Sequence, residues 1–163
     1  MLKRIDGRYV HKLHEENVLI ASVRETPGRE GWYDAEMVHD MGHPFFFEHP
    51  LDHIPAMMLV EAGRQLGIAI SHLFLGVTMG TMFATRSFDI RFTEFAETTT
   101  PVVISASVTD KRYRKGELIH LRMDGYFSQD TRPLGSMAGS WSMLQPRVWK
   151  RYRRLEQHRV LVG

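Results

Sequence analysis

The feature that most constrains the fold is a single apolar stretch, residues 54–77, which is followed by segments that alternate between apolar and polar residues. An apolar stretch of this length, with charges on one side, predicts a buried helix. We expect the helix to begin near Asp52 to Pro55 and to end near Gly76, which gives about 20 residues and roughly 30 Å. Asp52 is predicted to cap the free amides, and Pro55 to lie in the first turn, where a missing donor costs nothing.

The chain after the helix has apolar residues at every second position in four segments, the period of half-buried strands. We expect these strands at residues 88–92, 102–108, 119–123 and 137–143. Turn residues separate them, which predicts an antiparallel meander. One or two further strands are expected before the helix: the first at residues 18–23, and a second, if it forms, at residues 32–39.

One long helix and a curved antiparallel sheet bury their apolar faces economically if the sheet wraps the helix. The expected class is therefore α+β, with the hotdog fold and five to six strands. The 163 residues are expected to form a single domain, residues 1–163, with a basic C-terminal extension from about residue 146 and a short closing helix over residues 149–158.

Composition excludes several classes of protein. The chain has no cysteine, so disulfides, a thiolate nucleophile and thiolate metal sites are excluded. The apolar stretch is interrupted by Glu61, Arg64, Gln65 and His72, which argues against a membrane span. The first residues lack the apolar segment of a secretory signal, so we expect a cytoplasmic protein.

Three polar residues lie on one face of the predicted helix. Glu61, Arg64 and Gln65 have the spacing i, i+3 and i+4, which lets them converge on one small volume. An ion pair between Glu61 and Arg64 at a dimer contact is one interpretation. The apolar surroundings favour a functional one, in which burial raises the pKa of Glu61, Arg64 partly restores it, and Glu61 acts as a general base.

The segment before the helix supplies further candidates for substrate binding. His49, Asp52 and His53 lie beside the free backbone amides of the helix, where a thioester or ketone oxygen could be held. Loop hydrogen bonding is an equal alternative for His53, and no third ligand gives the histidines the spacing of a metal site. Phe46 and Phe47 suit an acyl-chain tunnel, although core packing would also explain an aromatic residue here.

Basic residues gather at Arg112, Arg114 and Lys115 and again over residues 150–154. A solvated charged loop is the simpler interpretation of the first group. The alternative is contact with the phosphate of a pantetheine carrier or with an acidic carrier protein. A nucleic-acid partner is not expected, because the basic segments lack a recognition helix and a stacking surface.

Most of the chain resembles the A-factor biosynthesis hotdog family, and the core of the resemblance is Asp-His followed by Glu-Ala-x-Arg-Gln. The matching segments are Val10-His11-Lys12, Val18-Leu19-Ile20, His43-Pro44-Phe45-Phe46, residues 49–57 and residues 59–65. The resemblance implies a hotdog fold related to the β-hydroxyacyl carrier-protein dehydratases, and an acyl thioester substrate. In the butyrolactone makers it implies transfer of a β-ketoacyl group from a carrier protein to the hydroxyl of dihydroxyacetone phosphate. Glu61 and Arg64 match the functional Glu and Arg of that family.

The expected partners are therefore an acyl carrier protein or coenzyme A thioester and a small-molecule acceptor. No metal or redox cofactor is expected, since phosphopantetheine arrives with the acyl donor. Family members that make butyrolactones usually carry two hotdog repeats, whereas this chain has length for one, so we expect a homodimer. Two alternatives remain: a dehydratase, isomerase or cyclase that uses His49 with Glu61, and a binding module without catalysis.

Overall fold

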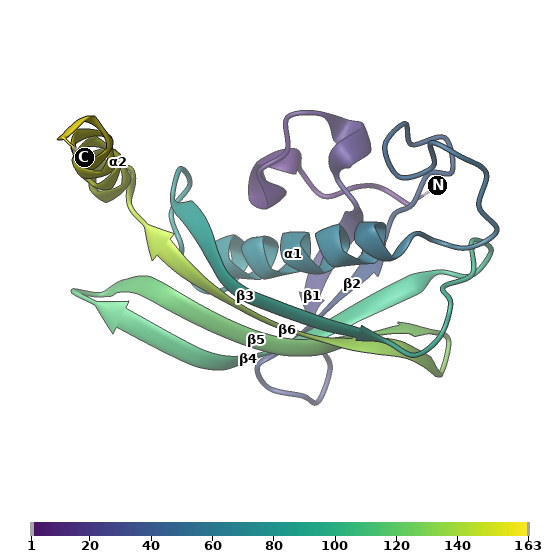
Figure 1. Cartoon of the computed structure of the whole chain (residues 1–163). Helices are drawn as coiled ribbons and strands as arrows, with labels where there is room; N and C mark the ends of the chain where they lie inside the picture. The colour runs from purple at the N-terminus through teal and green to yellow at the C-terminus, as the bar shows by residue number, and fades with distance from the viewer. Residues whose placement is uncertain (1, 163) are drawn as a thin grey trace.

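The computed structural model describes residues 2–162, with side chains up to residue 154, and shows a six-stranded antiparallel sheet curved around one helix (Figure 1). The predicted α+β hotdog fold is confirmed. Two short 3-10 helices come first, and the C-terminal segment is helical. The elements are η1 Gly7–Val10, η2 Glu15–Asn17, β1 Ile20–Glu25, β2 Trp32–Met37, α1 Ala56–Leu73, β3 Met82–Phe92, β4 Val102–Arg114, β5 Glu117–Gln129, β6 Arg132–Leu144 and α2 Pro146–Val162.

The strand order in the sheet is β1-β2-β4-β5-β6-β3. Strands β4, β5 and β6 form the predicted meander, but the prediction that β3 belongs to it is wrong. Strand β4 has β2 on one edge and β5 on the other, so β3 pairs instead with the free edge of β6. Alternation locates a strand along the chain but does not choose its neighbour.

The start and the end of helix α1 differ from the prediction. The N-cap position is Pro55, which makes no side-chain cap, and Asp52 is exposed and bonds instead to the Nδ1 atom of His53 at 2.8 Å. The predicted cap by Asp52 is therefore wrong. His53 forms a β-bridge with Glu97, and this pairing holds the chain extended just before the helix, away from its first amides. The helix ends at Leu73, and Gly76 turns the chain with a φ of +68°.

Helix α1 lies against the concave face of the sheet, where the buried side chains of the sheet include Ile104, Phe127 and Trp141. A Cβ atom at Gly63 would lie 2.7 Å from the sulfur of Met137, so this glycine permits the close approach of helix and sheet. Element η1 covers the face of α1 that points away from the sheet (Figure 1). A functional side chain on that face therefore lies between α1 and η1.

The basic C-terminal extension forms helix α2, which is longer than predicted and begins directly after β6 at one end of the sheet (Figure 1). Among the residues that the structure describes, no helix combines the length and the apolar character needed to cross a membrane.

Candidate functional site

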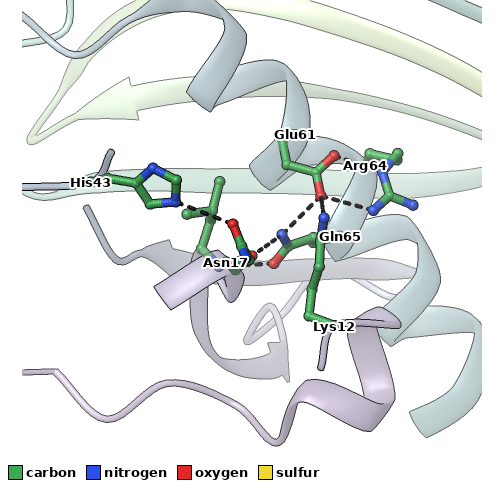
Figure 2. A network of polar contacts seen from close by, with 7 residues as sticks. Lys12, Asn17, His43, Glu61, Arg64 and Gln65 are labelled. Atoms are coloured by element: carbon green, nitrogen blue, oxygen red, sulfur yellow. Dashed lines mark hydrogen bonds and ion pairs between the residues drawn. The ribbon is translucent and has the colours of Figure 1, made fainter. Parts of the chain in front are cut away.

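The centre of the candidate site is the carboxylate of Glu61, which contacts two cations (Figure 2). Arg64 binds it through two nitrogens, with Nε to Oε2 at 2.7 Å and Nη2 to Oε1 at 2.8 Å. Lys12, from the segment after η1, places its Nζ 2.9 Å from Oε1. The sequence prediction that Glu61 and Arg64 meet is confirmed, whereas the contribution of Lys12 was missed.

Gln65 is fully buried and donates a hydrogen bond to this carboxylate. Its Nε2 donates to Oε1 of Glu61 at 3.0 Å and to the backbone carbonyl of Asn17 at 2.8 Å, and its Oε1 accepts the backbone N–H of Leu19 at 2.8 Å. Both amide hydrogens and the carbonyl oxygen are therefore engaged within the chain. Gln65 joins α1 to the start of β1, and it fixes the rotamer of Glu61.

The pKa of Glu61 lies well below its ordinary value, which corrects the sequence prediction that it is raised. Burial raises the pKa and is the largest single effect, but the hydrogen bonds from Arg64, Gln65 and Lys12, together with the charge of Arg64, lower it to about 2. The prediction counted one cation and an apolar helix. The structure adds Lys12, which lies 49 positions earlier in the chain.

A second contact holds η1 on the helix. His72 donates from Nδ1 to the carbonyl of Val77 at 2.8 Å, so its Nε2 is free to accept from Nε2 of His11 at 2.9 Å. Burial lowers the pKa of His11, and the charges of His72 and Arg64 lower it further, which favours the neutral imidazole. Lys12 follows His11 directly in the chain, so this contact helps to hold Lys12 over Glu61.

His43, also missed by the sequence analysis, extends the network through Asn17 (Figure 2). It is buried, and its Nδ1 accepts the backbone N–H groups of Phe45 and Phe46 at 3.2 and 3.3 Å. Its Nε2 must then carry the hydrogen and donate to Oδ1 of Asn17 at 3.3 Å. This contact connects the loop before α1 to Asn17, whose backbone carbonyl accepts a hydrogen bond from Gln65.

The other predicted site residues lie outside this cluster. His49 and Asp52 are exposed in the loop, and Phe46 and Phe47 pack against the hydrophobic core. His53 lies against the ring of Phe95, with 5.0 Å between ring centroids. No cluster of three or more His, Asp or Glu side chains that could hold a metal ion occurs among the described residues.

An apolar cavity of about 340 Å³ lies at the start of α1. It is lined by His53, Leu59, Phe92 and Phe95, among others. Leu59 and Glu61 are two residues apart, so they point about 200° apart around the helix. Within one chain, the cavity and the Glu61 carboxylate therefore lie on different sides of α1.

The fold and this polar helix face define a protein of the hotdog class. A hot-dog-like protein from Thermanaerovibrio acidaminovorans has a similar structure, with a TM-score of 0.58 and 10% sequence identity over 77% of this chain and 89% of that one. The profile of the A-factor biosynthesis hotdog domain (AfsA) matches residues 1–145, and the chain belongs to this family.

Two curated relatives are each named 2-oxo-3-(phosphooxy)propyl 3-oxoalkanoate synthase. The protein from Streptomyces virginiae is 47% identical over 47 residues, which is 28% of this chain and 16% of the relative. The protein from Streptomyces coelicolor is 36% identical over 69 residues, which is 42% of this chain and 20% of the relative. The matched segments thus span about a fifth or less of those proteins.

Proposed function

We propose that this protein is an acyltransferase that moves a β-ketoacyl group from a carrier-protein or coenzyme A thioester to the hydroxyl of a small phosphorylated acceptor such as dihydroxyacetone phosphate. The name that the two relatives share describes a 3-oxoalkanoate ester of an alcohol that carries a ketone and a phosphate. Family membership supports the same class of reaction.

The observation that carries the proposal is the surplus of positive charge around Glu61. Two cations, Lys12 and Arg64, meet one carboxylate, so the cluster has a net charge of +1. The Nη1 atom of Arg64 makes no hydrogen bond to the residues that the structure describes. Lys12 and Arg64 remain 26% and 32% exposed, so an anion from solvent can reach them. A phosphate is the kind of ligand that such a pair of cations binds.

In the proposed reaction, the hydroxyl oxygen of the acceptor attacks the carbonyl carbon of the thioester. A carbon–oxygen bond forms, the carbon–sulfur bond breaks, and the thiol is the leaving group. Glu61 receives the proton of the hydroxyl and returns it to the sulfur, so the enzyme ends the cycle unchanged.

Binding of the acceptor explains how a carboxylate with such a low pKa can accept a proton. The phosphate competes with Glu61 for Lys12 and Arg64, and each hydrogen bond that Glu61 loses removes a contact that lowers its pKa. Burial of the carboxylate then dominates and raises the pKa toward the range that suits a general base. The base is thus active only when the acceptor is present.

We further propose that the protein is a homodimer whose second protomer completes the site. Strand β3 is eleven residues long and lies at the edge of the sheet, where β6 is its one partner among the described strands. A long edge strand is a template for pairing with another chain. Phe92 and Phe95 lie at its end, are 37% and 69% exposed, and line the apolar cavity. Pairing through this edge would bring an acyl cavity of one protomer near the partner.

The test is a mass-spectrometric assay with purified protein, β-ketoacyl and β-hydroxyacyl thioesters, and dihydroxyacetone phosphate. We expect a β-ketoacyl ester to form only when the acceptor is present. Glu61→Gln and Arg64→Ala should each lower turnover by about 10² or more while the fold is retained. Glu16→Gln, on an exposed surface of η2, is the matched control. Loss of water from a β-hydroxyacyl thioester without the acceptor would overturn the transferase assignment in favour of a dehydratase.

A further inference from the structure

A second cavity, of about 560 Å³, lies at the end of the sheet where α2 begins. It is bordered by the start of β3, the turn between β4 and β5, and the first turn of α2. We call it the basic groove because its described lining contains four cations and one carboxylate, Glu117. The cations are Arg86, Arg114, Lys115 and Arg147.

Within the part of the chain whose side chains are described, these four charges have no acidic partner. None of them forms an ion pair with any residue whose side chain the structure describes, and all four are exposed. Four cations and one carboxylate leave the groove with a net charge of +3. Arg86 is oriented by a hydrogen bond from its Nε to Oγ of Ser142 at 2.9 Å. The groove is therefore a region of positive potential in which the sheet orients one of the four cations.

Helix α2 extends this positive region beyond the groove. It carries further exposed cations at Lys150, Arg151, Arg153 and Arg154. The charge thus continues over a surface much longer than one phosphate group, which fits a macromolecule better than a small anion.

The groove also has an apolar part, which favours a protein over a polynucleotide as the anionic partner. Leu118, Met143 and Leu144 line it, and Ile119 and Val148 are 37% and 45% exposed beside them. Apolar contacts within a charged rim are typical of a protein interface, whereas a polynucleotide backbone would leave them unused.

We propose that the basic groove docks an acidic surface of the carrier protein that delivers the acyl thioester. This inference rests on the acyltransferase function proposed above. Opposite charge on the two surfaces would speed their encounter and orient the carrier, and the apolar part would hold one of its side chains.

The position of the groove relative to Glu61 is compatible with delivery by a flexible arm. Thr81 lines the groove, and Phe83, two residues later, lies 5.4 Å from the ring of His72 near the end of α1. His72 and Glu61 are eleven residues apart, which corresponds to about 16 Å along the helix. The carrier would thus sit at one end of α1 while its thioester reaches Glu61 beside η1.

The test compares three donors that carry the same 3-oxooctanoyl group: an acidic acyl carrier protein, coenzyme A and N-acetylcysteamine. For the double variant Arg114→Glu/Lys115→Glu we expect kcat/KM with the carrier to fall about tenfold or more. Turnover of the N-acetylcysteamine thioester should stay unchanged, because this donor has neither protein nor phosphate. Arg24→Glu, an exposed charge reversal on β1, is the control and should leave all three rates unchanged.

The outcomes separate this inference from the proposed function. Unchanged kcat/KM with the carrier in the double variant, in a protein that still needs Glu61, would overturn the docking site and leave the function standing. An equal loss with the carrier and with coenzyme A would show that the groove binds phosphate alone, and would also overturn it. If wild-type protein transfers the acyl group from none of the donors, the proposed function fails instead.

Discussion

Replacing Glu61 with Gln should remove the decrease in the free energy of unfolding that protonation of this carboxylate causes at low pH. The pKa of Glu61 falls from 4.5 to about 2 on folding, and such a change contributes about 3 kcal/mol to the free energy of unfolding at pH 7. The side chain is 21% exposed, so screening by solvent makes this figure an upper value. Because the folded pKa is the lower one, the contribution is complete above pH 4.5 and disappears as the pH falls towards 2.

The assay is urea unfolding of the wild type and of Glu61→Gln at a fixed protein concentration, at pH 7, 5, 4 and 3. The quantity of interest is the wild type minus the variant at each pH, because contributions from all other groups cancel in this difference. We expect the difference to shrink by about 2 kcal/mol between pH 7 and pH 3. The variant loses its charge at every pH, so its own curve should be flatter in this range.

Glu16→Gln provides the comparison, since it removes a carboxylate of the same type from an exposed position. A difference between wild type and Glu61→Gln that stays constant from pH 7 to pH 3 would refute the reasoning. It would mean that Lys12, Arg64 and Gln65 do not stabilise the ionised carboxylate in the folded protein.

Four further substitutions test the surroundings of the site and the packing of the sheet. Lys12→Met removes one cation from Glu61, so calorimetric titration should show at least tenfold weaker binding of dihydroxyacetone phosphate. Gln65→Leu leaves the buried N–H of Leu19 unpaired and should lower the free energy of unfolding in urea by about 3 kcal/mol. Gly125→Ala should lower the melting temperature more than Gly63→Ala, because its added Cβ meets the backbone oxygen of Ser105, whereas at Gly63 it meets the flexible side chain of Met137.

The sequence predicted α1 and the last four strands because each of them has a local period. Alternation located the last four strands and the long apolar stretch located α1. The pairing of β3 with β6 could not be predicted, since it brings together segments about 50 residues apart and depends on which edges of the sheet are free. The predicted cap by Asp52 failed for a similar reason, because the β-bridge between His53 and Glu97 determines the path of the chain before the helix.

In the candidate site, too, the residues that lie close together in the sequence were predicted, and their partners from distant segments were not. The spacing of Glu61, Arg64 and Gln65 placed them correctly on one helix face. Their partners come from the segment around η1 and η2, and no helical or strand period connects Lys12 or Asn17 to α1. Both lie in or near the segments that resemble the family motif, which is the only signal that pointed to them. The predicted rise in the pKa of Glu61 was wrong because the direction of the change depends on those distant partners.

The number of cations around Glu61 separates a structural role from a functional one. A partly buried ion pair that serves only stability needs one cation for one carboxylate, because each further buried charge costs desolvation energy. Here Arg64 already binds both oxygens, and Gln65 supplies another hydrogen bond, so the carboxylate is satisfied without Lys12. The structure nevertheless holds Lys12 in place, with η1 fixed to α1 by the contact between His11 and His72. One positive charge in the cluster thus exceeds what the carboxylate balances, and this is the strongest support for the proposed phosphorylated acceptor.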